Sequence, residues 1–129
     1  MILVDTHVVI WLAFNPDHLS RKARVAIDDA RKKAAGLAIS GITLLELATL
    51  ACKGRIHLDI SLESFLQEVE SRFVVLPMSG KVCARATGLP EIYPKDPADR
   101  IIGATALVAG LPLLTADRQI RRSKVVQTV

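Results

Sequence analysis

Short apolar runs alternate with segments of helical periodicity along the whole of this 129-residue sequence. An unbroken apolar run is typical of a strand that is buried on both faces of a parallel sheet. Such runs occupy residues 1–4, 37–39, 73–76 and 113–115, and residues 124–128 are a candidate fifth strand. Strands that alternate with helices predict a three-layer α/β/α sandwich with a mainly parallel sheet of four to five strands. The length predicts one domain over residues 1–129.

Capping residues mark the ends of several expected helices. Ser20 and Ser61 are candidate N-caps, and Gly36 and Gly54 are candidate stop residues. Pro97 follows Asp96 at a first helical position, where the missing amide hydrogen costs nothing. We therefore expect helices at residues 8–12, 20–33, 41–53, from 61 onward, 81–87 and 96–109.

Composition and charge limit the environment and the partners of the chain. The net charge is +4, which favours an anionic partner, and half of the residues are hydrophobic, which predicts an apolar face covered by a partner protein or a second copy. The longest uncharged stretch, residues 101–116, is too short and too interrupted to span a membrane. The first residues lack the basic segment of a secretion signal. We expect a cytoplasmic protein.

Two cysteines are too few and too far apart to define a zinc site or a disulfide framework. Cys52 and Cys83 belong to no CxxC pair. We expect both to be small core residues.

Four acids follow the predicted strands or begin the helices after them: Asp5, Glu46, Asp99 and Asp117. In open α/β sheets, ligands bind at the carboxyl ends of the strands, so the four side chains can face one pocket. Several carboxylates in one place repel one another and require a cation, and an all-carboxylate set selects Mg²⁺ or Mn²⁺ over zinc. The sequence therefore predicts a divalent-metal site.

Each acid also has an ordinary explanation, because Asp and Glu are favoured at helix N-termini. Asp5 and Asp117 can cap the helices after them, Asp99 lies three residues after a possible Asp96 cap, and Thr43 with Glu46 matches a capping box. Glu46 is the hardest to explain in this way, since apolar residues flank it on the same helical stripe.

The same residues resemble a known family, the PIN-domain proteins, and in particular the toxin ribonucleases of the VapC type. The resemblance covers nearly the whole chain and rests on four motifs in the correct order: residues 4–7 followed by 10–12, residues 40–47 leading to 54–56, residues 96–106, and residues 114–117. It implies a Mg²⁺- or Mn²⁺-dependent endoribonuclease, homodimerisation and inhibition by a cognate antitoxin. The family's acidic positions fall on Asp5, Glu46, Asp99 and Asp117, and its polar helper positions on Thr6 and Thr115. Residues 92–95 depart from the family's pattern, which bears on substrate preference.

The expected chemistry is metal-assisted hydrolysis of an RNA phosphodiester bond. Only five residues are aromatic, so we expect substrate binding by phosphate contacts rather than by stacking. The candidate phosphate ligands are Arg100, Arg118, Arg121 and Arg122. We expect His7 to be packed and hydrogen-bonded rather than catalytic.

Two other functions are compatible with an acidic cluster on this fold. One is hydrolysis of a different phosphate, by a DNA nuclease, a PIN nuclease that is not a toxin, or a phosphatase. The other is a non-catalytic Mg²⁺-binding interaction module of the receiver type. The paired acids and the later Lys of such a receiver are not found here.

Overall fold

A computed structural model describes residues 1–33 and 35–129 and contains one four-stranded sheet. The strands are β1 (Ile2–Val4), β2 (Leu37–Ser40), β3 (Val74–Leu76) and β4 (Leu113–Leu114). Their order is β3-β2-β1-β4 and every neighbouring pair is parallel, which confirms the predicted parallel sheet. The candidate fifth strand is reduced to a single parallel bridge between Leu113 and Thr128.

Helices follow each strand, and most of the expected ones are present. They are α1 (Thr6–Phe14), α2 (Arg21–Lys32), α3 (Gly41–Cys52), α4 (Leu62–Arg72), α5 (Gly80–Thr87), α6 (Pro97–Ala109) and α7 (Arg118–Ser123), with a 3-10 turn, η1 (Pro16–His18), after α1. Ser20 and Ser61 are N-caps, as expected. Gly36 and Gly54 both adopt the left-handed conformation, with φ of 78° and 72°, that favours glycine after a helix.

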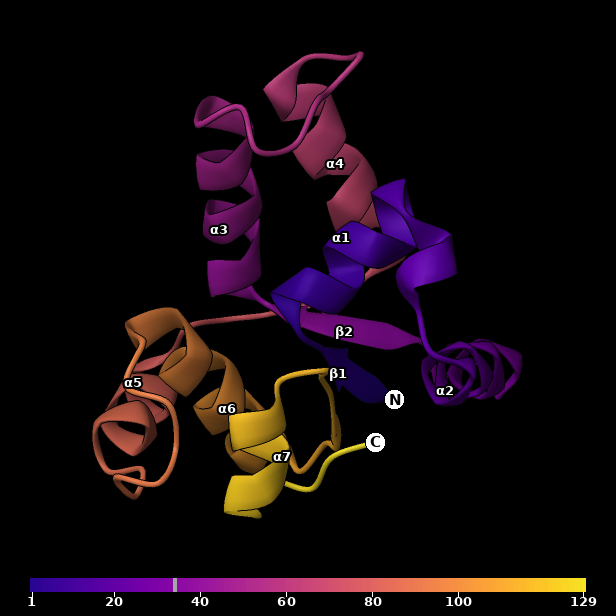
Figure 1. Ribbon diagram of the computed structural model, residues 1–129. Coiled ribbons are helices and arrows are strands. Elements are labelled where there is room, and N and C mark those ends of the chain that lie inside the picture. The colour runs from indigo at the N-terminus through magenta and orange to yellow at the C-terminus, as the bar shows by residue number, and fades with distance from the viewer. Residues whose placement is uncertain (34) are drawn as a thin grey trace.

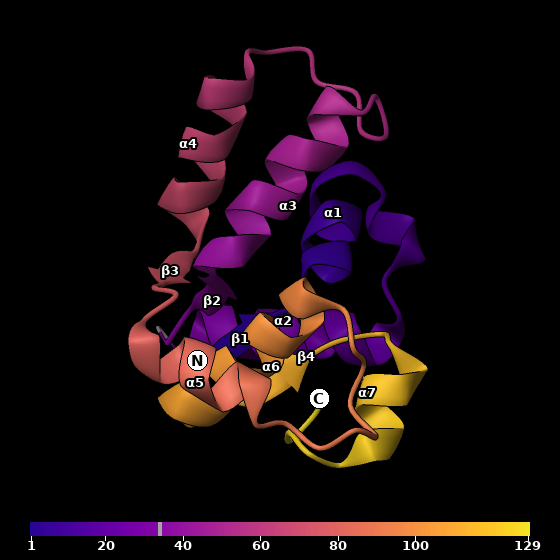
Figure 2. The ribbon, with the colours of Figure 1, turned by 90° about the vertical axis from the view of Figure 1, so that its left-hand side faces the viewer.

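The helices cover both faces of the sheet and form the predicted three layers (Figures 1 and 2). One core joins β1 and β2 to α1, α2, α3 and α4, with Val4, Ile39 and Leu47 at its centre. The other core joins the opposite face to α6 and α7 through residues such as Leu3, Ile102 and Ile120. Helix α5 packs on the outside of α6.

The sheet has its topological switch point between β1 and β4. From β1 the chain moves to β2 and β3 on one side, and only later adds β4 on the other side of β1. The connections therefore diverge between β1 and β4, which is where open α/β sheets bind ligands.

The two cysteines do not lie in the core, contrary to the expectation. Cys52 and Cys83 are both exposed. Cys83 follows Val82 on α5, and the buried stripe of that helix runs from Val82 to Ala86, so the adjacent position faces outward. Among the described residues, no helix has the length and apolar character needed to cross a bilayer.

Candidate active site

Asp5 lies at the end of β1, between two hydrogen-bond donors. Its Oδ1 accepts from the backbone N–H of Thr6 at 2.8 Å, which caps α1, and its Oδ2 accepts from the Thr115 hydroxyl at 2.6 Å. The pairing of Val4 with Leu114 brings Thr115 beside Asp5. Asp5 is only 5% exposed, and burial raises its pKa even though the bond from Thr115 opposes the shift.

Glu46 joins this group through two threonine hydroxyls. Thr6 donates its hydroxyl proton to Glu46 Oε1 at 2.6 Å, so the 3.0 Å contact between the Thr6 and Thr43 hydroxyls must be donated by Thr43. Ser40, rather than Thr43, caps α3, so the capping-box explanation of Glu46 is wrong. Burial raises the pKa of Glu46, and the charges of Asp5 and Asp96 raise it further.

Asp99, in the first turn of α6, is the most strongly perturbed acid of the group. Its pKa is raised to about 7, first by burial and then by the charges of Asp5, Asp96, Glu46 and Asp117. This mutual repulsion means that the four predicted acids lie in one electrostatic neighbourhood. The N-cap of α6 is Asp96, whose Oδ2 accepts from the Asp99 N–H at 3.1 Å.

Asp117 lies at the exposed rim of the cluster. It caps α7 by accepting from the Ile120 N–H at 3.0 Å, and its own N–H donates to the Thr115 hydroxyl oxygen at 3.1 Å. Thr115 therefore joins the Asp117 backbone to the Asp5 carboxylate. The capping explanations of Asp5 and Asp117 are correct, but capping does not account for a buried carboxylate among like charges.

The carboxylates lie near one another, but they do not converge on a single point as the ligands of a bound metal ion do. In the described part of the chain, no three Asp, Glu, His or Cys side chains are close enough together to hold one ion as they stand. Both Asp5 oxygens are engaged by protein donors, and Glu46 Oε1 is held by Thr6. The donor set nevertheless suits a hard divalent cation, because such an ion would offset the burial and the mutual repulsion that together raise the three pKa values.

Arg100 does not face the acids, contrary to the expectation of a substrate contact. Its guanidinium donates to four backbone carbonyl oxygens: those of Ala86 at 3.3 Å, Leu89 at 2.9 Å, Pro90 at 3.2 Å and Tyr93 at 3.4 Å. These bonds hold the segment between α5 and α6. The geometry gives Arg100 a structural role.

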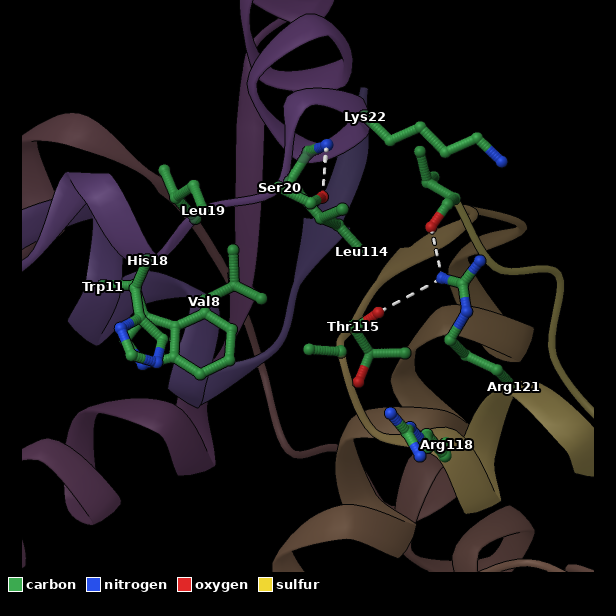
Figure 3. A pocket seen from close by; sticks show the side chains of 13 residues that line it. Val8, Trp11, His18, Leu19, Ser20, Lys22, Leu114, Thr115, Arg118 and Arg121 are labelled. Carbon is green, nitrogen blue, oxygen red and sulfur yellow. Dashed lines mark hydrogen bonds between the residues drawn. The ribbon is translucent and has the colours of Figure 1, made fainter.

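The other three predicted arginines lie on α7. Arg121 donates through one terminal nitrogen to the carbonyl oxygens of Thr115 and Val129. Arg118 and Arg121 line a cleft beside Thr115 (Figure 3), whereas Arg122 is exposed outside it.

His7 lies near the acids and is not packed, contrary to the expectation. It is exposed rather than packed, and a positive charge on it lowers the pKa of both Asp5 and Glu46. The buried residues of α1 are Thr6, Val8 and Val9. Successive residues of a helix are rotated by about 100° around its axis, so the His7 side chain points away from this buried face.

Tyr93 lies close enough to the acids to feel their charge. It is fully buried, and burial raises the pKa of its hydroxyl, with the charges of Asp5, Asp99 and Asp117 adding to the effect. A Cβ atom on Gly103 would lie 2.3 Å from the Tyr93 hydroxyl oxygen, so this part of α6 needs a residue without a side chain. The sequence offered no signal for this pairing, since the two residues are on different elements.

A family model and a curated relative both match nearly the whole length of the chain. A family model of the PIN domain matches residues 2–125. The protein named Ribonuclease VapC22, from Mycobacterium tuberculosis, is 40% identical over 120 residues, which are 93% of this chain and 89% of the relative.

Solved structures of other proteins have the same fold as this chain. A chain of a toxin-antitoxin complex from Klebsiella pneumoniae aligns with a TM-score of 0.63 and 28% identity, over 91% of this chain and 87% of that one. A chain of VapBC2 from Rickettsia felis, solved with a DNA fragment from its promoter, aligns with a TM-score of 0.70 over 100% of this chain and 98% of that one. The second match has 19% identity and shows the fold alone.

Proposed function

Because the chain belongs to the PIN-domain family, we propose that it is a divalent-metal-dependent endoribonuclease and the toxin of a toxin-antitoxin pair. Ribonucleases of this family generally depend on a divalent ion. The observation that carries the proposal is the cluster of mutually repelling carboxylates at the ends of β1 and β4. It occurs in a chain that is 40% identical to a named ribonuclease.

The proposed ligands of Mg²⁺ or Mn²⁺ are Asp5, Glu46 and Asp99, with Asp117 as an outer ligand at the rim. A bound ion of this type supplies Lewis acidity toward a phosphodiester oxygen and activates water for hydrolysis. Thr6 and Thr115 orient the carboxylates of Glu46 and Asp5 through short hydrogen bonds, and the acids must move closer together to bind one ion. The raised pKa of Asp99 means that this side chain is partly protonated near neutrality, so occupation of the site releases a proton; metal binding should strengthen as the pH rises through about 7 and level off above it.

The test of this function is RNA cleavage by variants of the buried acids. Purified wild-type protein should cut RNA in Mg²⁺, and the Asp5→Asn and Asp99→Asn variants should lose nearly all of that activity. Asp28→Asn, which changes an exposed acid of α2, is the matched control and should cut normally. Parallel reactions with DNA and with mononucleotides distinguish a ribonuclease from a nuclease or phosphatase of other specificity. Undiminished RNA cleavage by folded Asp5→Asn protein would exclude the proposed site.

The proposed partner is an antitoxin that covers apolar surface. A cleft of about 580 Å³ lies beside α1 and α4. Its lining is mixed: the apolar residues include Leu12, Phe14, Ile60, Phe65 and Phe73, and the charged residues are Arg31, Asp59, Glu68 and Arg72. Phe14 and Ile60 are 42% and 45% exposed, which is costly for large apolar side chains unless a partner covers them. A similar fold occurs in a toxin-antitoxin complex. We place the apolar segment of the antitoxin in this cleft.

A homodimer in the cytoplasm remains our prediction for the assembled toxin. Light scattering coupled to size exclusion gives the mass directly. A mass of about 28 kDa, twice that of the 14.0 kDa chain, is the expected result. A 14.0 kDa species that stays soluble without a partner would contradict both the dimer and the covered apolar face.

A further inference from the structure

A second cleft lies beside the acidic cluster and is not needed to hold a metal ion. Its volume is about 370 Å³, within the range of small-ligand sites. It opens between α1, η1 and the start of α2 on one side and β4 with α7 on the other (Figure 3). Thr115 forms part of its wall, and the same residue donates to Asp5. The cleft therefore adjoins the proposed cleavage site directly.

Three cations line this cleft. Arg118 and Arg121 belong to α7 and Lys22 to the start of α2, and none of the described lining residues is Asp or Glu. Arg121 is held in place by the carbonyl oxygens of Thr115 and Val129 through one terminal nitrogen, and among the described residues its other terminal nitrogen has no such partner. Lys22 lies in the first turn of α2, where the helix dipole adds positive potential. These groups suit a phosphate.

Two rings line the side of the cleft formed by α1 and η1. The rings of Trp11 and His18 lie 5.0 Å apart at an interplanar angle of 40°, next to Val8 and Leu19 (Figure 3). A planar nucleobase gains binding energy from such a surface. The fold thus builds a ring-bearing surface from Trp11 and His18, whereas the small number of aromatic residues alone favoured phosphate contacts.

From this arrangement we infer that the cleft binds one nucleotide of the RNA next to the scissile phosphodiester bond. Its phosphate contacts Lys22, Arg118 and Arg121, and its base lies against Trp11 and His18. The inference rests on the proposed ribonuclease function and adds a base-recognition subsite to it. The three cations alone would suit any polyanion, whereas their combination with the ring-bearing surface and the adjoining acids favours a single-stranded nucleotide.

Trp11 is the only tryptophan in the chain, so its fluorescence reports on this cleft alone. We propose a titration with an RNA oligonucleotide of about four nucleotides in EDTA, where binding is measured without cleavage. The wild-type protein should show saturable quenching of Trp11. The Lys22→Ala/Arg118→Ala double variant should bind about tenfold more weakly or worse, because two phosphate contacts are lost. His18→Ala should also weaken binding.

A double variant of α5, Lys81→Ala/Arg85→Ala, is the control because it removes the same charge from exposed positions outside the cleft. It should bind as the wild type does. An abasic ribose-phosphate oligomer of equal length and an oligoglutamate peptide should not quench Trp11. Quenching by either of them, no quenching by RNA, or equal affinity for RNA in the Lys22→Ala/Arg118→Ala variant would overturn the inference.

The Asp5→Asn variant separates this inference from the proposed function. It should lose cleavage in Mg²⁺ and retain quenching in EDTA, because Asp5 does not line the cleft. If the wild type binds RNA here but does not cut it, the ribonuclease proposal fails and the subsite stands. If it cuts RNA without quenching Trp11, the subsite fails alone.

Discussion

Replacement of Asp99 by Asn should stabilise the metal-free protein at the same time as it removes activity. The pKa of Asp99 is raised from an ordinary value of 3.8 to about 7, chiefly by burial and then by the neighbouring carboxylates. The folded state therefore binds this proton more tightly than the unfolded state does. The resulting stabilisation is complete below pH 3.8 and is lost as the pH rises through about 7, so above pH 7 the ionised carboxylate opposes folding.

The magnitude follows from the difference between the two pKa values. At about 1.36 kcal/mol per pH unit, the interval from 3.8 to about 7 corresponds to an upper limit of about 4 kcal/mol. Asp99 is only partly buried, and solvent screening lowers the expected penalty to about 1 to 2 kcal/mol. An isosteric Asn removes the charge. For a chain of this size, the gain corresponds to a rise in Tm of about 3 to 8 °C.

Thermal unfolding followed by circular dichroism, in EDTA at several pH values, measures this effect. The Tm advantage of Asp99→Asn over the wild type should be largest at pH 8 and should shrink steadily toward pH 4. Asp28→Asn should show no such trend. Added Mg²⁺ should raise the Tm of the wild type more than that of Asp99→Asn. A variant that is no more stable than the wild type at pH 8 in EDTA would refute the reasoning.

Three further substitutions test the supporting interactions. Thr115→Val removes the hydroxyl that bonds Asp5 and the Asp117 N–H, so it should lower the rate of RNA cleavage by about 10-fold or more and also lower the Tm, while Thr115→Ser should restore both. Arg100→Met leaves four carbonyl groups without their donor and should cost about 2 to 4 kcal/mol of unfolding free energy in urea, and wild-type stability would contradict the structural role. Gly103→Ala should lower the unfolding free energy in urea by about 1 to 3 kcal/mol, because the added methyl group meets Tyr93. If this clash is the cause, the same substitution should lower it less in a Tyr93→Leu background. An equal loss in both backgrounds would exclude the clash as the cause.

The fold could be predicted because local and global signals agree along this chain. Strands that are buried on both faces leave apolar runs in the sequence, and the caps at Ser20 and Ser61 mark helix starts by their side-chain chemistry. The acids could be located because parallel strands end at one edge of the sheet. Once the order of the elements is known, Asp5 and Asp117 must follow β1 and β4 at that edge.

The directions of side chains were the main source of error. Arg100 follows Asp99 in sequence, but successive residues of a helix differ by about 100° around its axis, so the arginine faces the segment before α6 rather than the acids. The same geometry exposes His7 and Cys83. Two neighbouring residues of a helix therefore point in different directions and need not belong to the same site.

Contacts between distant elements left no signal in the sequence. The hydroxyl chain from Thr43 through Thr6 to Glu46 depends on the packing of α1 against α3. The ring-bearing surface of Trp11 and His18 depends on the turn η1, which no periodicity marked. These features required the three-dimensional arrangement of the chain.

The most direct test of the central proposal is an NMR titration with Mn²⁺, whose unpaired electrons broaden the signals of nearby amides. The account predicts that trace Mn²⁺ broadens the amides around Asp5, Glu46, Asp99 and Asp117 first, that excess Mg²⁺ reverses the effect, and that Asp5→Asn weakens it. Broadening that begins at other acids, such as Asp28 or Glu68, with the signals of Asp5 and Asp99 unchanged, would contradict it.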